Sequence, residues 1–279
     1  MNGILLIDKP AGWTSSDVVA KLRGVLHEKR IGHSGTLDPM ATGLLVLFVG
    51  RATRAVEFAE SHDKCYLAGL RLGIITDTQD TTGNPVGGEP RPVSRDELEA
   101  ALAGFRGEIE QIPPMYSAIK VKGQKLYEIA RRGGEVERKP RPVTIRSLTI
   151  VGETEGDWLL DVACSKGTYV RTLCHDIGAA LGCGGCMSSL RRLAAGSYRL
   201  EDAHTLEKVM EAADAGEAES FFCRQTACFR NIPGSRSALR ARKRSAAATA
   251  CRRGRRKGST ACTARAGNSW PWCAYRRTK

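Results

Sequence analysis

Apolar residues in the first 221 positions recur with two periods, one typical of strands and one typical of helices. Residues 44–49 are apolar at every position, which predicts a strand that is buried on both faces. Residues 66–72 alternate in character and predict another strand. Further strands are predicted at 3–7, 143–151 and 158–164, and a turn near Gly156 joins the last two.

Helices are predicted where the apolar residues share one face. Thr14 to Asp17 offer capping chemistry before a helix that includes Val18 and Leu22, and Ser94 with Glu97 forms a capping box before a second helix. Three more helices are predicted: one around 126–132, one that follows Arg171 with Leu173, Ile177, Ala180 and Leu181 on one face, and one at 205–213.

These elements predict the fold class. Residues 76–93 are rich in Thr, Asp, Gly and Pro and are expected to form a loop. The chain has no internal repeat, and its strands and helices are mixed without a regular βαβ rhythm. We therefore predict an α/β fold in the loose sense (mixed α+β), with a central mixed, largely antiparallel sheet flanked by helices.

The pattern stops near residue 222. Residues 222–279 contain one Ile, one Leu and no Val, which is too little apolar surface to offset the conformational entropy lost on folding. We therefore expect a folded domain at 1–221 and a basic, mostly disordered tail at 222–279. A natural RNA-binding arm is one explanation for the tail, but its five Cys and two Trp residues are unusual for such an arm.

Charge is divided unequally between these two parts. The chain has a net charge of +13, but residues 222–279 hold 16 of its 43 Lys and Arg residues and none of its 30 Asp and Glu residues. The first 221 residues therefore carry a net charge of −3. Within them, Lys120 to Arg146 hold nine cations and three anions, which suits either a solvated charged face or a surface that follows a phosphate backbone.

Cysteine usage and hydropathy exclude several classes of protein. Cys183 and Cys186 form a lone CxxC without a second pair at zinc spacing, so we expect a tight, partly buried turn and no metal site. The apolar run at 4–7 is too short for the core of a signal peptide, and no segment resembles a membrane span. We therefore expect a cytoplasmic protein.

One glycine-rich loop, Gly32 to Gly43, places a single carboxylate just before the predicted strand at 44–49. Its glycines permit backbone conformations that other residues resist, and Pro39 stiffens the position after Asp38. Asp38 is either a turn residue or a catalyst, since an Asp-Pro pair alone more often nucleates a turn. The loop lacks the lysine and the glycine spacing of phosphate-binding loops.

Four segments, taken together, resemble the tRNA pseudouridine-55 synthase family. They are 6–12 (LIDKPAG), the loop at 32–43 (GHSGTLDPMATG), 113–120 (PPMYSAIK) and 164–172 (CSKGTYVRT), and they occur in the family's order and spacing. The motifs at 181–184 and 190–193 extend the resemblance, which covers residues 2–221. It implies that residues 1–221 form a pseudouridine-synthase-like catalytic domain.

The resemblance implies a reaction as well. Enzymes of this family detach uracil from its ribose at N1 in the tRNA T-loop, turn the base and reattach it through C5. The reaction is an isomerisation and needs no cofactor, and the nucleotide must first be flipped out of its stack. Three roles for the catalytic carboxylate stay open: attack at C1′, attack at C6 of uracil, or removal of the C2′ proton. Each role needs an ionised acid.

The resemblance also assigns the site residues. Asp38 matches the catalytic aspartate, Arg171 its arginine partner, and Tyr66 the tyrosine that stacks on the base and serves as a late general base. Arg171 is expected to lower the pKa of Asp38 and to orient it. The expected substrate-binding residues are His33, which organises the extruded base, Lys9 and Pro10, which support the pocket, and Tyr169 and Leu190, which pack around the base.

Each of these residues has a simpler interpretation when taken alone. Tyr66 would be a half-buried strand residue, Arg171 a solvent-exposed residue, and His33 a hydrogen-bonding partner of the loop backbone. Two other functions also stay open: a non-catalytic module that binds or folds tRNA, and pseudouridylation of another RNA such as rRNA. The expected partner is the T-arm of tRNA, with no membrane and no protein partner, and we expect a monomer.

The tail departs from the family, whose members usually continue into a small C-terminal RNA-binding domain. Codons allowed for Phe221 to Phe229 can, in another reading frame, encode Leu-Leu-Pro-Ala-Asp-Ser-Leu-Phe, which suits such a domain. We therefore hypothesise that a frameshift near residue 221 replaced that domain with unselected sequence.

Overall fold

The structure is a computed structural model, and it describes residues 1–60, 62–121 and 123–223. The predicted disorder of the tail therefore lies outside the described residues, apart from residues 222 and 223. In chain order the strands and helices are β1 (Gly3–Lys9), α1 (Ser15–Val25), β2 (Ile31–Ser34), β3 (Thr42–Val49), α2 (Val56–Glu60), β4 (Lys64–Leu72), β5 (Ile75–Thr76), β6 (Pro85–Gly87), α3 (Arg95–Ala103), β7 (Gly107–Gln111), β8 (Lys120–Val121), β9 (Gln124–Lys125), α4 (Leu126–Ala130), β10 (Arg141–Thr154), β11 (Asp157–Cys164), α5 (Val170–Ala180), β12 (Gly185–Ala195), β13 (Tyr198–Arg199), β14 (His204–Thr205), α6 (Leu206–Asp214) and β15 (Phe222–Cys223).

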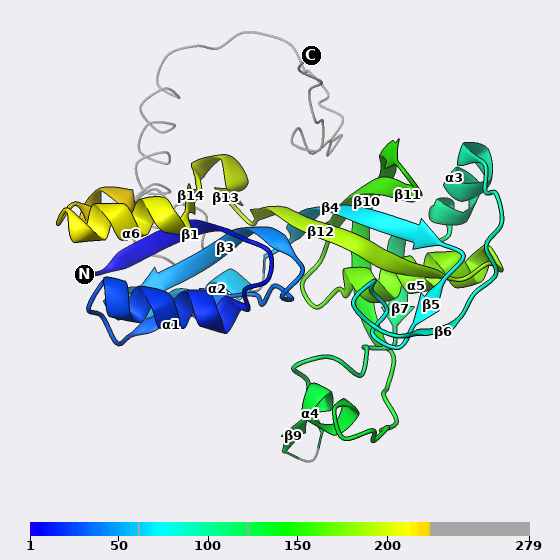
Figure 1. The fold of residues 1–279 in the computed structure, drawn as a ribbon, viewed down its shortest axis with the longest axis horizontal. Coiled ribbons are helices and arrows are strands. Elements are labelled where there is room, and N and C mark those ends of the chain that lie inside the picture. The colour runs from blue at the N-terminus through cyan, green and yellow to red at the C-terminus, as the bar shows by residue number, and fades with distance from the viewer. Residues whose placement is uncertain (61, 122, 224–279) are drawn as a thin grey trace, which may run out of the picture. The chain divides into compact units, whose positions relative to one another are not determined.

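One large mixed sheet organises these elements (Figure 1). Its main path runs β14-β1-β3-β12-β4-β11-β10-β7. The β1–β14 and β3–β12 pairs are parallel, whereas β1–β3, β12–β4, β4–β11, β11–β10 and β10–β7 are antiparallel. The predicted mixed, largely antiparallel sheet flanked by helices is therefore confirmed.

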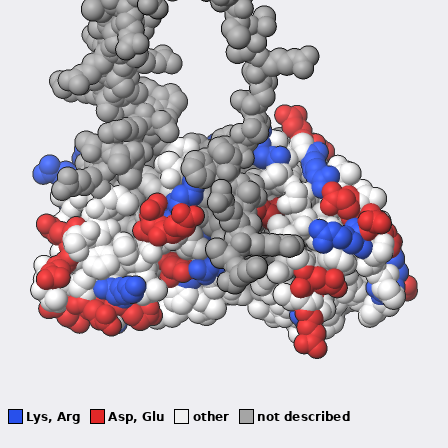
Figure 2. All heavy atoms as spheres, turned by 90° about the horizontal axis from the view of Figure 1, so that it is seen from above, with Lys and Arg blue, Asp and Glu red and all other residues white. Residues whose placement is uncertain are grey.

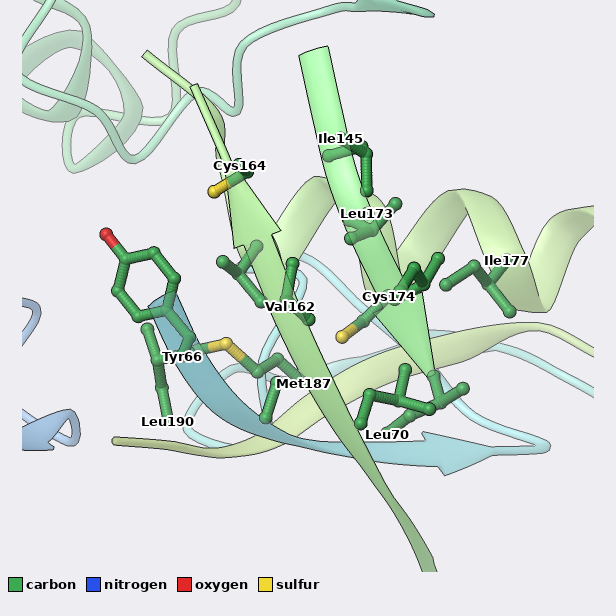
Figure 3. Packing of buried hydrophobic residues seen from close by; sticks show 14 of the residues in the cluster. Tyr66, Leu70, Ile145, Val162, Cys164, Leu173, Cys174, Ile177, Met187 and Leu190 are labelled. Carbon is green, nitrogen blue, oxygen red and sulfur yellow. The ribbon is translucent and has the colours of Figure 1, made fainter. Parts of the chain in front are cut away.

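Two apolar clusters cover the sheet and account for its helices. In one cluster, α1 and α6 pack on β1 and β3 through residues such as Val18, Leu206 and Leu45. In the other, α3 and α5 pack on β4, β10, β11 and β12 through residues such as Leu98 and Leu173. Figure 3 shows part of this second cluster, where Leu173, Cys174 and Ile177 of α5 face the sheet.

Local sequence explains where the helices begin. The Thr14 side chain accepts a hydrogen bond from the backbone of Asp17, and Asp17 returns one to the backbone of Thr14, so the predicted capping chemistry of α1 is confirmed. Ser94 likewise caps α3 by accepting from the Glu97 backbone. The carboxylate of Glu97, however, pairs with Arg91 instead of closing the capping box.

The residues predicted as one loop, 76–93, hold more structure than expected. β5 and β6 form a small hairpin within them, and Asp80 bridges to Met187 of β12. Gln79 adopts a left-handed backbone with φ of 64°, and the side chain of Thr172 donates to its amide oxygen at 2.9 Å. This segment is therefore fixed against α5 and β12.

Cys183 is buried in the tight turn that leads into β12, and Cys186 is buried as the second residue of that strand. In the described part of the chain, no cluster of His, Cys, Asp and Glu has the arrangement of a metal site. No helix among the described residues combines the length and apolar character needed to cross a bilayer.

Candidate active site

The site is built where the β2–β3 loop meets β12 and the first turn of α5. Asp38 lies in that loop, and Arg171 is the second residue of α5. The guanidinium holds the carboxylate through two contacts, Nε to Oδ2 at 3.0 Å and Nη2 to Oδ1 at 3.4 Å. Two residues that are 133 positions apart thus form a forked ion pair, a geometry that fixes the orientation of the carboxylate.

Arg171 is in turn anchored by several other groups. Its side chain is 7% exposed, and it donates to the carbonyl oxygens of Thr78 and Tyr116 at 3.1 and 2.8 Å. Its Nη1 also lies 3.6 Å from Oδ2 of Asp80, a buried carboxylate. Asp80 accepts further hydrogen bonds from Thr78 and Thr82. Asp38, Arg171 and Asp80 therefore form a carboxylate–guanidinium–carboxylate triad.

The pKa of Asp38 does not follow the simple expectation. Burial raises it above its ordinary value, and this effect outweighs the lowering by Arg171; the charge of Asp80 raises it further, and Lys9 lowers it slightly. Arg171 therefore lowers the pKa of Asp38 as predicted, but burial of the carboxyl group has the larger effect and leaves the pKa above its ordinary value. The Asp38 side chain is still 36% exposed, so substrate can reach it.

Lys9 and Ser15 fix the Asp38 loop through hydrogen bonds to its backbone. Lys9 is fully buried at the end of β1, and its Nζ donates to the carbonyls of Pro10, Trp13 and Pro39 at 2.8, 2.6 and 3.4 Å. Burial lowers the pKa of Lys9 to about 8. The hydroxyl of Ser15 donates to the Leu37 carbonyl and accepts from the Leu37 amide, so the residue before Asp38 is clamped on both sides.

Strand register brings the remaining residues into line. Lys9 pairs with Gly43, Gly43 with Arg192, and Arg192 with Tyr66, in one row across β1, β3, β12 and β4. Gly43 has φ of +96°, and a Cβ there would lie only 2.4 Å from the Arg192 carbonyl oxygen. The last glycine of the loop is therefore required for the close approach of β3 and β12.

Tyr66 lies at one edge of the apolar cluster. Its ring packs beside Leu190 and Met187, and its hydroxyl points away from Leu70 and Ile177 (Figure 3). The residue is 7% exposed, and burial raises its pKa to about 12 while the nearby Arg192 charge lowers it. Tyr66 is thus a strand residue, as the simpler interpretation held, and its hydroxyl lies at the edge of the apolar cluster.

Tyr169 and His33 flank the centre on two sides. Tyr169 is the residue before α5; its backbone is held by both ends of the buried Gln111 amide. Burial raises the pKa of Tyr169, and the charges of Arg171 and Asp38 also act on it. Burial, followed by the Arg192 charge, lowers the pKa of His33, whose Nδ1 has no hydrogen-bond partner in the described part of the chain.

A hollow of about 600 Å³ opens beside Tyr169. Two cations line it, Arg141 at the start of β10 and Lys166 in the turn before α5, together with the single anion Glu57 of α2. Within the described ranges neither cation has an ion-pair partner. On the face that Figure 2 shows, charges of both signs are mixed.

Sequence reasoning assigned Asp38, Arg171, Lys9, Pro10, Tyr66, Tyr169 and Leu190 to one site, and the structure brings them into one region. His33 lies near Arg192, and within the described part of the chain it forms no hydrogen bond or ion pair with Asp38. Three contributors were missed: Asp80, Ser15 and Arg192. Asp80 stands in a polar loop segment, and Ser15 adjoins a capping motif, so neither carried a distinct signal. Arg192 belongs to the motif at 190–193, in which the resemblance gives this residue no chemical role.

Comparison with known proteins assigns the segments that carry these motifs to a protein family. Residues 23–170 match the N-terminal domain of the TruB family of pseudouridylate synthases, and residues 171–227 match the C-terminal domain of tRNA pseudouridylate synthase B. The tRNA pseudouridine synthase B of Opitutus terrae is 48% identical over 220 residues, which cover 78% of this chain and 91% of that protein. That of Heliobacterium modesticaldum is 52% identical over 215 residues, which cover 76% and 70%.

A solved structure agrees with the sequence comparison. A chain in the crystal structure of a Cbf5–Nop10–Gar1 complex is 31% identical and superposes with a TM-score of 0.62. The match covers 78% of this chain and 58% of that one. With relatives close to 50% identity over most of its length and a family match across the Asp38 loop, the chain belongs to the TruB family of pseudouridylate synthases.

Proposed function

We propose that Asp38 is the carboxylate with which this enzyme isomerises uridine to pseudouridine in tRNA, at position 55 of the T-loop. The observation that carries the assignment is the forked ion pair between Asp38 and Arg171. Arg171 is too buried to serve only as a solvent-exposed cation, and the carboxylate it holds stays accessible. An oriented, accessible carboxylate is the group that the reaction requires.

The isomerisation exchanges one bond of the base for another. The N1–C1′ bond breaks, a C5–C1′ bond forms, and the C5 proton leaves as N1 gains one, so atoms and electrons balance without an oxidant or a cofactor. Asp38 acts at C1′, at C6 or on the C2′ proton, and all three roles need its ionised form. Arg171 favours that form and offsets part of the cost of burial.

The other predicted residues would bind the flipped nucleotide. In this proposal Tyr66 and Leu190 contact the uracil ring, Tyr169 borders it near α5, and His33 organises it from β2. Tyr66 is also the proposed late general base for the C5 proton. Lys9 and Pro10 act through the loop, since the Lys9 ammonium joins three backbone carbonyls around Asp38.

The proposed partner is the T-arm of tRNA, bound by a cytoplasmic monomer. The hollow beside Tyr169 supports this partner, because Arg141 and Lys166 line it without an ion-pair partner among the described residues and can contact backbone phosphates next to the target nucleotide. Its volume is within the range that holds a small ligand or a nucleotide. The target uridine must leave its stack for its C1′ to reach Asp38.

We further propose that residues 1–221 form the complete catalytic domain and that residues 222–279 replace a small RNA-binding domain. The Opitutus terrae relative supports a catalytic unit of this size, because the match covers 91% of its length. The gene sequence tests the frameshift: an alternative frame after residue 221 must give a continuation with regular apolar periodicity, and the idea fails if none does.

A tritium-release assay tests the function. T-arm RNA that carries tritium at C5 of its uridines is incubated with the full chain and with the 1–221 fragment, and an rRNA hairpin serves as the competing substrate. We expect release from the T-arm RNA with both proteins, and weaker RNA binding by the fragment because it lacks the +16 tail. Binding without release would favour a non-catalytic module, and release from the rRNA hairpin alone would favour another substrate.

A further inference from the structure

Arg192 is a fully buried cation that the proposed chemistry does not yet use. Its exposed fraction is 0%, and none of the described carboxylates lies within ion-pair distance. Its Nε donates to the Leu44 carbonyl at 2.7 Å, and its Nη2 donates to the Gly35 carbonyl at 3.0 Å. A buried charge without a counter-ion is costly.

The glycines of the loop are arranged around this side chain. Gly35 has φ of +78°, and a Cβ there would lie 3.3 Å from Nη1 of Arg192 and 3.2 Å from Cε of Lys64. Gly43, at the other end of the loop, approaches the Arg192 backbone even more closely. Both glycines, one on each side of Asp38, therefore lie in close contact with Arg192.

The third nitrogen of the guanidinium, Nη1, differs from Nε and Nη2. It is buried and has no hydrogen-bond partner in the described part of the chain. Burial raises the pKa of the Tyr66 phenol most, the charge of its cross-strand partner Arg192 lowers it, and the charges of Cys164 and Asp38 raise it further. Arg192 also acts on His33 and Lys9.

We propose that Arg192 is a positioning residue for the isomerisation: it ties the Asp38 loop to β12, and its unpaired Nη1 keeps positive charge beside the Tyr66 phenol. This inference rests on the proposed function of Asp38 and Tyr66. When the C5–H bond breaks, its electron pair returns to the uracil ring and the proton passes to the phenolate oxygen. The guanidinium would favour that phenolate in a site where burial opposes it.

Two substitutions separate the loop contacts from the charge. Arg192→Lys keeps the cation and loses the fork, whereas Arg192→Met loses both. We expect Arg192→Met to lower kcat for tritium release by at least about 100-fold at saturating RNA. Arg192→Lys should recover about tenfold of that loss, with T-arm affinity close to that of Arg192→Met.

A second readout distinguishes charge from folding. Fluorotyrosine at position 66 has a more acidic phenol, so it should restore part of the kcat of Arg192→Met and add little to the wild type. Thermal melts verify that each variant is folded at the assay temperature. The inference is overturned if folded Arg192→Met retains wild-type kcat, or if its loss is the same with lysine and with fluorotyrosine. Absence of release from the wild-type enzyme would instead contradict the proposed function.

Discussion

At the scale of single residues, the site depends on how two carboxylates share one guanidinium. Asp38 and Asp80 both face Arg171, but only Asp38 is open to solvent. Asp80 fixes Arg171 from behind, and its charge also raises the pKa of Asp38. These two effects have opposite consequences for the reaction, and a single substitution can separate them.

Asp80→Asn should lower the plateau of kcat by about 10²-fold, because Arg171 loses a fixed partner and the carboxylate it holds is misplaced. The same substitution should move the acidic limb of the pH profile to lower pH. The sign follows from the charge: Asp80 raises the pKa of Asp38, so its neutralisation lowers that pKa and the ionised form persists into more acidic solution.

The pH dependence of kcat/KM for tritium release, which reports groups of the free enzyme, checks this shift. In the wild type the acidic limb should lie above 3.8, the ordinary pKa of an Asp side chain. A limb that stays in place or moves to higher pH in Asp80→Asn would contradict the electrostatic role of Asp80.

At the scale of elements, the sequence indicated most of the strands that carry a simple period. β3 was predicted from an unbroken apolar run and β4 from alternation, and both form as expected. β12, at the centre of the sheet, was missed. Its register shifts between Met187 and Ser189 and again between Arg192 and Ala194, so its alternation is interrupted twice.

The residues of the site could likewise be predicted only in part. Asp38, Tyr66 and Arg171 were found because they lie in family motifs, whereas Ser15 and Asp80 act through contacts between distant segments. A serine next to a capping threonine has no sequence signal for a loop 22 residues away. Such roles depend on the register of β1, β3 and β12, which local patterns do not specify.

A matched pair at the start of α1 tests the role of Ser15. Thr14→Ala removes the cap of α1, and Ser15→Ala leaves the Leu37 amide without its acceptor. Each should reduce the free energy of unfolding by about 1–2 kcal/mol. Only Ser15→Ala should also lower kcat, by about tenfold, because only Ser15 holds the Asp38 loop.

Urea unfolding and tritium release, measured on both variants, check this prediction. Equal stability with unequal activity is the expected pattern. If both variants lose kcat to the same degree, the loss follows from helix stability, and Ser15 has no separate function in the loop.

At the scale of the whole molecule, net charge gives a poor guide to the RNA-binding surface. The +13 arises from residues 222–279, and residues 1–221 carry −3. Residues 1–221 must therefore attract RNA through local groups. The hollow beside Tyr169 is lined by one anion and by two cations that have no ion-pair partner among the described residues. Charges of opposite sign in one hollow permit an internal control.

Lys166→Gln should weaken binding of T-arm RNA several-fold and reduce the slope of log K against log salt by about 0.7, the value for one lost phosphate contact with a single strand. Glu57→Gln should strengthen binding, because it removes repulsion of the same phosphate. Lys208→Gln on α6, an exposed residue distant in the fold from α5, serves as the control and should change neither quantity.

Fluorescence anisotropy across a salt series, with the full chain for every variant, keeps the contribution of the tail constant. Effects of the same sign in Lys166→Gln and Glu57→Gln would indicate a general disturbance of the hollow. A loss in Lys208→Gln equal to that in Lys166→Gln would show that the charge effect is not local.

The most direct test of the central claim is tritium release from C5-labelled T-arm RNA by Asp38→Asn. Asparagine keeps the shape of the side chain but cannot be ionised, so we expect release to fall by at least about 10⁴-fold. RNA affinity should stay within a few-fold of the wild type, because the RNA contacts proposed here lie elsewhere. Release at the wild-type rate from a purified Asp38→Asn enzyme would contradict the assignment of Asp38 as the catalytic carboxylate.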